Sequence, residues 1–487
     1  MKRKVKAKYI IAYCKDHNEV FYNGELIYEN DTILGVGYNL PECEETFDYG
    51  NSIITPGFID INALGDIDHE PFFDEVKCPE QLLWSKKYYE AGAVECMSKE
   101  EEAFKSYYAF AQLISHGITT ALPITCTYYK SNAETYEEMY SAAENAKKLG
   151  IRAYLGPSFL SKMKIYDPID GSSTLMDLPQ GKDGLHRAEK FVKDFINDDS
   201  GLIGVAMVPE RIEYQTEETL IESKEFAKEY SIPYRLHAAQ GKFEYEHIMK
   251  TYGKSTIKYM DSIGILDDKT IIPHVIYASG YSKLSDKSND DLLILKERGT
   301  HIAHCPLVYA RGGTSLESFG RYTNLGLNIC MGTDTYPCDM LDNIRIGRAM
   351  SATHDGLTDD NTFIKFFEAA TLGGARALGR DDLGKLCKGA KADFVVFDLN
   401  KFDIGPKDNP LITLCNNVMS NDIDTVVING KTVLEKGLLV GFDYEQVMKD
   451  GQAYYDKLKN SFIERSAFDK EGFYSGGYPI NYEHESV

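Results

Sequence analysis

The sequence lacks the features that mark membrane, secreted and nucleic-acid-binding proteins. No apolar run approaches the ~18 residues of a membrane span. The start, MKRKVKAKYIIAYC, has an apolar run shorter than the ~7–15 residues of a signal-peptide core, and we expect a first β-strand there. A net charge of −22 argues against binding to phosphates or to an anionic membrane. We therefore expect a cytoplasmic protein that binds neither nucleic acid nor membrane.

Several metal and redox motifs are also missing. The ten cysteines are scattered without any CxxC pair, which indicates reduced, mostly buried thiols. The chain contains no HExxH motif and no HxE…PCxxC pattern. These absences exclude a disulfide framework, a zinc knuckle and two common zinc-enzyme architectures.

What the chain does contain is a long alternation of short apolar runs and helical stretches after Pro56. At 487 residues it suits one large α/β barrel with a smaller companion. Several runs follow a helical segment that ends near a glycine or a charged turn, such as AENAKKLG. This alternation predicts a (β/α)8 TIM-like barrel over residues 55–382. Its eight expected strands are 53–61, 117–124, 150–156, 202–208, 233–239, 270–278, 299–305 and 327–334.

Strand-like alternation also occurs on both sides of this region. The segment EVFYNGELIYENDTILGVGYNL carries Asn23-Gly24, a strong hairpin signal, and DTVVINGKTVLEKG carries a second Asn-Gly pair. We expect residues 1–54 and 383–440 to form one small composite β-sandwich domain. Residues 441–487 should add a C-terminal amphipathic helix, roughly Tyr444–Phe462, and a turn-rich tail.

Polar residues at the ends of the expected barrel strands are the first candidates for a site, because barrel enzymes carry their chemistry there. Several histidines converging on one mouth with an aspartate are typical of a metal or acid–base site. His301 and His304, three residues apart on one strand, must point to opposite faces. The strand-end candidates are Asn62, His237, His274, His301, His304 and Asp334.

Seven segments, in order, resemble the amidohydrolase superfamily, in the branch of cytosine-, guanine- and triazine-type (chlorohydrolase-like) aminohydrolases. The similarity runs from about residue 20 to about residue 435. The segments are ITPGFIDIN, LISHGITTALPI, RLHAAQGKFE, IIPHVIYASGYS, HIAHCPLVYARGG, MGTDTYPCDMLDNIR and ATLGGARALGRDDLGKLCKGAKADFVVFDL. The resemblance implies a barrel with a small β domain, as the strand pattern also predicts.

The resemblance implies a zinc or iron ion held by an HxH pair on strand one, the strand-five histidine and the strand-eight aspartate. A strand-six histidine and a glutamate after strand five would handle protons and substrate. In this chain the matching metal-binding and proton-handling residues are His237, His274 and Asp334. The HxH positions, however, are Asn62 and Leu64, and the glutamate position is Gln240.

These replacements have a large physical consequence. A catalytic metal lowers the pKa of its water from about 15.7 to about 7, which corresponds to about 12 kcal/mol. His237 and Asp334 alone are fewer than the three donors that zinc sites need, and Gln240 cannot shuttle a proton. A loop rich in acids follows strand one, and His69 with Asp66 or Asp68 could rebuild the site. The alternative interpretation of this loop is a solvated acidic segment.

The resemblance, together with the residues present, implies a hydrolase of non-peptide carbon–nitrogen bonds in a small nitrogen heterocycle or cyclic amidine. It also implies one divalent metal, zinc or iron, with a metal-free site as the other possibility, a small-molecule substrate, and a homodimer or homotetramer. The alternative is a metal-free or non-catalytic relative that binds a ligand or serves in assembly. Expected roles are catalysis for Asp334 and His274, substrate binding for His304, Gln240, Glu244 and Asn62, and metal binding for His237, Asp334, His274 and His69. Arg311 could bind an anionic group of the substrate, and a surface arginine is at least an equal interpretation.

Overall fold

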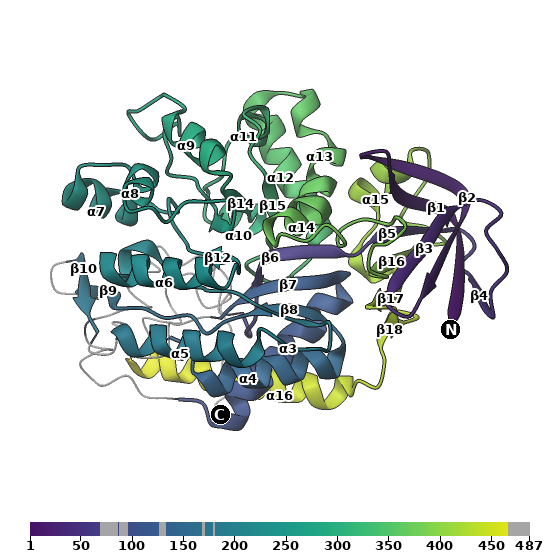
Figure 1. Ribbon diagram of the computed structural model, residues 1–487, viewed down its shortest axis with the longest axis horizontal. Helices are drawn as coiled ribbons and strands as arrows, with labels where there is room; N and C mark the ends of the chain where they lie inside the picture. The colour runs from purple at the N-terminus through teal and green to yellow at the C-terminus, as the bar shows by residue number, and fades with distance from the viewer. Residues whose placement is uncertain (69–85, 87–95, 126–132, 168–170, 179–180, 466–487) are drawn as a thin grey trace, which may run out of the picture.

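The computed structural model describes residues 1–68, 86, 96–125, 133–167, 171–178 and 181–465. A larger region of parallel strands and helices adjoins a smaller region made mainly of antiparallel strands (Figure 1). Within these described ranges, no helix has both the length and the hydropathy that crossing a bilayer requires.

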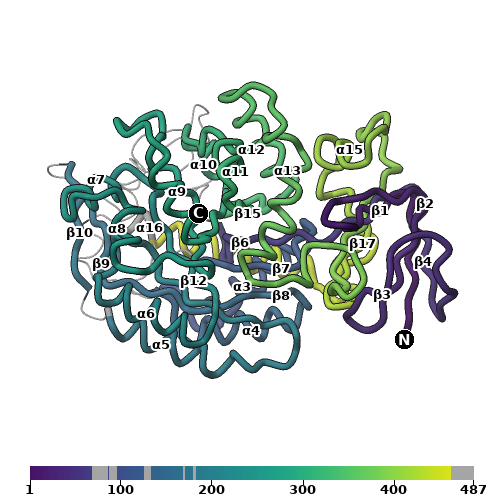
Figure 2. Tube along the Cα trace, turned by 45° about the horizontal axis from the view of Figure 1, so that its top comes forward, coloured from purple at the N-terminus to yellow at the C-terminus, as the bar shows by residue number. Residues whose placement is uncertain are grey.

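The smaller region is one sheet that joins the start of the chain to its later part (Figure 2). Strands β5 and β16 pair antiparallel, with Pro56 opposite Phe394 and Ser52 opposite Asp398. The two β-rich segments therefore pair as expected, but the described strands form one continuous nine-stranded sheet, and a two-sheet sandwich is not shown. In sheet order the strands are β19 (Leu438–Leu439), β18 (Lys431–Glu435), β17 (Ile423–Ile428), β16 (Phe394–Asp398), β5 (Ser52–Pro56), β1 (Lys2–Cys14), β2 (His17–Glu29) and β3 (Thr32–Gly37), with β4 (Glu45–Asp48) beside β1.

The two Asn-Gly pairs have different outcomes. Asn429 and Gly430 join β17 to β18, and both have the positive φ angles that a tight hairpin turn requires. Asn23-Gly24, in contrast, lies inside β2, so the prediction of a turn there is wrong. The first hairpin turns at Lys15 and Asp16, whose φ angles are 48° and 64°. Asn23 keeps its positive φ within the strand, as an interruption of the pairing between Ala7–Gly24 and Tyr9–Tyr22.

The predicted first barrel strand, 53–61, is in fact two strands. Residues before Gly57 form β5 of the smaller sheet, and β6 (Phe58–Leu64) begins the parallel strands of the larger region. A Cβ atom at Gly57 would lie 2.1 Å from the Thr119 hydroxyl oxygen, so only glycine fits at this crossing. One apolar run therefore serves two sheets, which hydrophobicity alone does not distinguish.

The larger region contains a strand in each of the eight predicted segments, but their ladders form two parallel sheets of four. Among the described residues, isolated bridges such as Met207–Tyr234 connect the two sheets on one side, and Asp334 N–H donates to Asn62 O on the other. The expected closed barrel is therefore not formed as a continuous ladder, because most of these strands are only two to four residues long. The sheets are β6, β7 (Ile118–Ile124), β8 (Arg152–Leu155) and β11 (Ile203–Val205), and β12 (Tyr234–Arg235), β13 (Thr270–Pro273), β14 (His301–His304) and β15 (Ile329–Met331).

Helices between these strands begin and end at the residue types that the sequence offers. Ser98 and Glu101 form a capping box at the start of α3, and Gly150 ends α4 with a φ of 82°. An additional hairpin, β9 (Lys162–Asp167) and β10 (Ser172–Asp177), was not predicted. The helices are α3 (Lys99–Ser115), α4 (Tyr136–Leu149), α5 (Gly181–Phe195), α6 (Glu217–Glu229), α7 (Lys242–Tyr252), α8 (Thr256–Ser262), α9 (Asp290–Arg298), α10 (Pro306–Arg311), α11 (Phe319–Asn324), α12 (Met340–Asp355), α13 (Phe363–Glu368), α14 (Gly374–Ala377), α15 (Pro410–Asn417) and α16 (Tyr444–Arg465).

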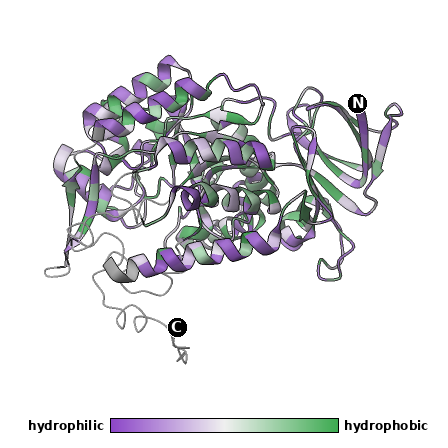
Figure 3. Ribbon diagram, turned by 90° about the horizontal axis from the view of Figure 1, so that it is seen from below, coloured by the Kyte–Doolittle hydropathy of each residue, from purple (hydrophilic) through white to green (hydrophobic). Residues whose placement is uncertain are grey.

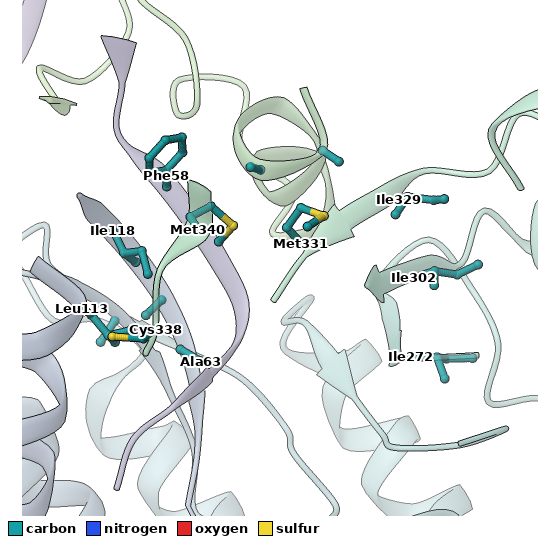
Figure 4. Packing of buried hydrophobic residues seen from close by; sticks show 14 of the residues in the cluster. Phe58, Ala63, Leu113, Ile118, Ile272, Ile302, Ile329, Met331, Cys338 and Met340 are labelled. Atoms are coloured by element: carbon teal, nitrogen blue, oxygen red, sulfur yellow. The ribbon is translucent and has the colours of Figure 1, made fainter. Parts of the chain in front are cut away.

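Apolar side chains from both parallel sheets pack into one core. Figure 4 shows Phe58 and Ile118 from β6 and β7 in the same cluster as Ile272, Ile302 and Ile329 from β13 to β15. The expected C-terminal helix is confirmed as α16, which runs along the outside of the larger region beside α3 (Figures 1 and 3). This packing fixes the strand ends at which the candidate residues lie.

Candidate active site

Four strand ends bring the predicted histidines and aspartate to one place. His237 follows β12, His274 follows β13, His304 ends β14 and Asp334 comes shortly after β15. His274 Nε2 lies 3.5 Å from Asp334 Oδ2, and the rings of His237 and His274 are 5.5 Å apart between centroids. The strand order thus places side chains from positions 237 to 334 within one buried mouth.

The backbone is strained where two of these residues sit. His274 has a φ of 74° and Asp334 a φ of 58°, a region that costs non-glycine residues about 1–3 kcal/mol each. Hydrogen bonds hold both in place, from His274 N–H to Ala303 O at 2.7 Å and from Asp334 N–H to Asn62 O at 2.9 Å. Strain of this kind, held by the surrounding fold, is typical of functional sites.

A third side chain, Cys305, joins His274 and Asp334. One nitrogen, sulfur or oxygen atom from each of these three residues lies within 4.8 Å of the others. Neither ring nitrogen of His274 has a hydrogen-bond partner among the described residues, although the residue is buried. The side-chain oxygen of Asn62 is buried without such a partner as well. Buried polar atoms normally find partners, so these atoms point to a group that this site is built to hold.

A guanidinium group lies on the opposite side of the mouth. Arg211 follows β11, donates a hydrogen bond to Gln240 Oε1, and lies 3.5 Å from Glu210 Oε1 through its Nε. His237 Nδ1 is 3.0 Å from Glu210 O, so this histidine is oriented by the same loop. The fourth and fifth strand ends therefore contribute a positive charge beside His237.

Burial and charge set the protonation of the site. Burial lowers the pKa of His274 and of His237 well below its ordinary value, and the Arg211 guanidinium adds to this effect. Burial raises the pKa of Asp334 well above its usual range, Asp60 adds to the rise, and Arg211 opposes it. Burial also raises the pKa of the Cys305 thiol, with a contribution from Asp334. The imidazoles are thus neutral, with a lone pair for a proton or a metal.

A small cavity opens beside these residues. The cavity has a volume of about 10 Å³, close to that of one water molecule, and is lined by His274, Ile276, His304, Cys305, Pro306, Tyr309, Ser315 and Leu316. The Tyr309 ring lies 4.6 Å from the His274 ring, and His304 packs near the Phe319 and Phe366 rings. Apolar walls with few polar groups are typical of small-molecule sites.

The donors that would hold a metal from strand one are missing in the structure as they are in the sequence. Leu64 offers no donor atom, and Asn62 directs its amide nitrogen toward Cys305 Sγ at 3.8 Å. Gln240 supplies only an amide, whose oxygen already accepts from Arg211. The residues present therefore do not fit a metal at the strand-one position.

Other predicted contacts are placed away from the mouth. Glu244 accepts hydrogen bonds from Ala239 N, Gln240 N and Thr256 Oγ1, so it shapes the loop that carries Gln240 instead of presenting a free carboxylate to substrate. His301 contacts Asp268 O at 3.2 Å and the Asn328 amide at 3.0 Å, on the face opposite His304.

The loop after β6 is only partly described. His69 lies outside the described residues. Asp66 lies 3.8 Å from Lys105 Nζ, and Asp68 accepts from Thr335 Oγ1 and Tyr336 N. Asp66 thus contacts helix α3, and Asp68 contacts the loop after β15. Arg311 donates to Thr335 Oγ1 and Tyr336 O, where it supports the loop after strand eight.

Four residues of the site were not predicted from the sequence: Asp60, Arg211, Cys305 and Tyr309. Arg211 comes a few residues after the fourth strand, so the strand-end rule used for the other residues could have found it. Asp60 sits two residues before Asn62 on β6 and accepts from Thr333 N and Oγ1. Cys305 adjoins His304, and nothing in the sequence distinguished it from an ordinary buried thiol.

Comparisons with known proteins agree with this geometry. Residues 53–433 match the amidohydrolase family. The chain is 25% identical over 480 residues to a 5-methylthioadenosine/S-adenosylhomocysteine deaminase of Thermodesulfovibrio yellowstonii, covering 94% of this chain and 99% of that protein. It is 23% identical over 434 residues to a 5'-deoxyadenosine deaminase of Methanosphaera stadtmanae, covering 86% and 91%.

A solved structure is similar over nearly the whole chain. The crystal structure of an adenosine deaminase from Xanthomonas campestris with bound zinc matches with a TM-score of 0.76 and 18% identity, covering 94% of this chain and 98% of that one. At this identity the likeness shows the fold alone.

Proposed function

Because the chain belongs to the amidohydrolase family, we propose that it is a hydrolase of carbon–nitrogen bonds that removes the amino group of an adenosine-type heterocycle. The observation that supports this most directly is the meeting of His274 and Asp334, whose Nε2 and Oδ2 atoms are 3.5 Å apart, beside a small cavity that His274 and His304 line. Two relatives that align over most of this chain are deaminases of adenosine-type nucleosides by name.

The reaction needs a group that takes a proton from water and returns it. Water adds to the ring carbon that bears the amino group, a carbon–oxygen bond forms, and the carbon–nitrogen bond then breaks to release ammonia. We assign the transfer of the proton to Asp334, since a carboxyl group can both accept and give up a proton and burial raises the pKa of this one. Neutral His274 beside it orients the water or the leaving nitrogen.

Three further residues are proposed to contact the heterocycle. His304 lines the cavity with His274, and its imidazole can face the ring of the substrate. The unpartnered side-chain oxygen of Asn62 can accept a hydrogen bond from the amino group. Gln240 is held by Arg211 on the other side of the mouth. No step runs through a metal at the strand-one position, because Asn62 and Leu64 do not supply its donors.

The proposal also includes the domain organisation of the chain. The eight parallel strands would work as the (β/α)8 barrel of residues 55–382, with residues 1–54 and 383–440 as a companion β domain. Use of zinc or iron, a homodimer or homotetramer, and a cytoplasmic location also stay predictions.

One observation favours the alternative, a metal-free relative that binds a small ligand. The Arg211 guanidinium lies close enough to lower the pKa of His237 and of His274 and to oppose the rise in the pKa of Asp334. A fixed positive charge there can hold an anionic or carbonyl oxygen without any metal. Under this alternative the protein binds a heterocycle and releases no ammonia.

A substrate panel tests the proposal. Ammonia release and the ultraviolet change of the purine are followed with 5'-methylthioadenosine, S-adenosylhomocysteine and 5'-deoxyadenosine. We expect turnover of at least one of them, and a loss of about 10²–10⁴-fold in kcat/KM for Asp334→Ala, the usual size of a proton-transfer contribution.

The matched control is His301→Gln, which changes a buried histidine that points away from the mouth. It should keep the wild-type kcat/KM. If the folded protein, with and without added zinc chloride, releases ammonia from none of the three compounds, the alternative replaces the proposal.

A further inference from the structure

We propose that the mouth binds one thiophilic divalent cation through His274, Cys305 and Asp334, at the ends of β13, β14 and β15 instead of β6. This site deepens the proposed aminohydrolase function, on which it rests for its chemical purpose. Its ligand atoms can be tested without any substrate.

The spacing of the donors fits a tetrahedral ion. With metal–ligand distances of about 2.0–2.2 Å to nitrogen and oxygen, neighbouring ligand atoms of a tetrahedral site are about 3.4 Å apart. His274 Nε2 and Asp334 Oδ2 are 3.5 Å apart, whereas an ordinary hydrogen bond between such atoms would measure about 2.7–3.2 Å. With the Cys305 sulfur, one ligand atom from each of the three residues lies within 4.8 Å of the others.

Buried polar atoms without hydrogen-bond partners also indicate a ligand at these three residues. His274 is 1% exposed and neither of its ring nitrogens has a hydrogen-bond partner among the described residues. Leaving a buried donor or acceptor unpaired costs about 1–3 kcal/mol. Asn62 Nδ2 lies 3.8 Å from Cys305 Sγ, which is the kind of contact that orients a thiolate ligand. Asn62 thus contacts the Cys305 sulfur on one side, and we expect the cation to bind on the other side of the sulfur.

Glycine at position 332 makes this approach of the sulfur possible. A Cβ atom there would lie 2.8 Å from Cys305 Sγ and 2.8 Å from Asn62 Cβ. With any larger residue here, the thiol or Asn62 would have to move. The three strands are therefore packed so that a sulfur atom reaches the mouth.

The local charges also favour a cation on this side. Asp60 is fully buried next to the site, and its negative charge acts on both Asp334 and Cys305. Arg211 and Arg235 oppose a cation, but Arg211 is engaged with Gln240 and Glu210, and Arg235 donates to Leu122 O. A divalent ion bound here would offset the negative charge of the Asp334 carboxylate and of a Cys305 thiolate.

The donor set predicts which ions bind. One imidazole nitrogen, one thiolate sulfur and one carboxylate oxygen suit zinc, cobalt, cadmium or ferrous iron, and not magnesium or calcium, which prefer oxygen donors alone. Three protein ligands with a fourth position left open are the pattern of a catalytic zinc site. A bound ion would there lower the pKa of a water molecule.

Cobalt(II) tests the sulfur ligand directly, because a thiolate bound to this ion gives a charge-transfer absorption in the near ultraviolet. The full-length protein, freed of metal with a chelator, is titrated with cobalt(II) chloride. We expect one equivalent per chain and this absorption in the wild type. Cys305→Ser should lose the absorption and bind cobalt at least about tenfold more weakly, since even residues that only orient a ligand contribute about 10–100-fold to affinity.

Cys330→Ser is the matched control. Cys330 is a buried cysteine of the adjacent strand β15, and its thiol donates to Ile302 O instead of reaching the mouth. This variant should keep the absorption. The inference is overturned if the wild type binds no cobalt, if it binds cobalt without the absorption, or if Cys305→Ser keeps it.

X-ray absorption of the zinc-loaded wild type provides a test that needs no variant. One sulfur neighbour at about 2.3 Å from zinc supports the site, and a first shell of nitrogen and oxygen alone overturns it. The outcome of these metal-binding tests is independent of the outcome of the substrate panel. A sulfur-bound metal without ammonia release refutes the proposed function and keeps this site, whereas ammonia release without a sulfur ligand does the reverse.

Discussion

The two sides of the mouth differ in the metal-donor side chains that they carry. On the β11 and β12 side, Gln240 offers no metal donor, and Arg211 adds a positive charge. On the β13 to β15 side, His274, Cys305 and Asp334 bring three donors together. The end of β6, with Asn62 and Leu64, adjoins this second side, where Asp334 N–H donates to Asn62 O. A fold can therefore keep its strand ends in register while the chemistry at each end changes independently.

The largest expected difference between the two sides is in catalysis. Asp334→Asn should lower kcat/KM by about 10²–10⁴-fold, because the amide cannot take a proton from water. Gln240→Ala should lower it by less than about tenfold, since an amide whose oxygen already accepts from Arg211 contributes no proton transfer. Steady-state kinetics with an accepted substrate measure both. Equal losses would show that the two sides share the chemistry.

The second difference concerns pH and the buried acids on the Arg211 side. Burial, with the neighbouring Glu244, raises the pKa of Glu213 from 4.5 to about 8. The folded protein thus keeps a proton that the unfolded chain releases, and stability falls as the pH rises through this window. Glu213→Gln should reduce that fall by up to about 3 kcal/mol between about pH 5 and pH 8.

Urea unfolding at both pH values measures this effect. Glu225→Gln is the control, because Glu225 is exposed on α6 and should leave the pH dependence as it is. If Glu213→Gln leaves the pH dependence of stability unchanged, a group other than Glu213 holds the proton.

The smallest expected effect concerns packing. Gly332→Ala should destabilise the protein by about 1–3 kcal/mol, because its methyl group would overlap Cys305 and Asn62. Gly241→Ala, at the start of α7 on the β12 side, adds a methyl group to open space and should change stability by less than about 1 kcal/mol. Thermal unfolding compares them. A Gly332→Ala protein as stable as Gly241→Ala would mean that the β15 side is not tightly packed around Cys305.

Much of the secondary structure could be predicted because it depends on local patterns. The eight apolar runs after Pro56 each contain a strand, and α16 begins at Tyr444, where the predicted helix begins. The failures come from positions where local signals compete. Asn23-Gly24 carries a turn signal inside a strand, and Gly57 splits one apolar run between two sheets through its contact with Thr119.

The candidate site was predictable in part for the same reason. His237, His274, His304 and Asp334 follow from their places at strand ends, and the structure gathers them in one mouth. Cys305 could not be weighed from sequence, because whether a thiol faces a mouth depends on packing between distant strands. Glu244 is the opposite case. Its position predicted a substrate contact, but Ala239 N–H and Thr256 Oγ1 already donate hydrogen bonds to its carboxylate.

The sequence by itself determined the alternation of strands and helices, the pairing of its two β-rich ends and the loss of the strand-one donors. These depend on residue type and spacing, which need no knowledge of distant contacts. Only the tertiary structure decided that Cys305, Asp334 and His274 lie within 4.8 Å of one another. The physical reason is that side chains from three separate strands reach one point only when the core beneath them fixes the register of those strands.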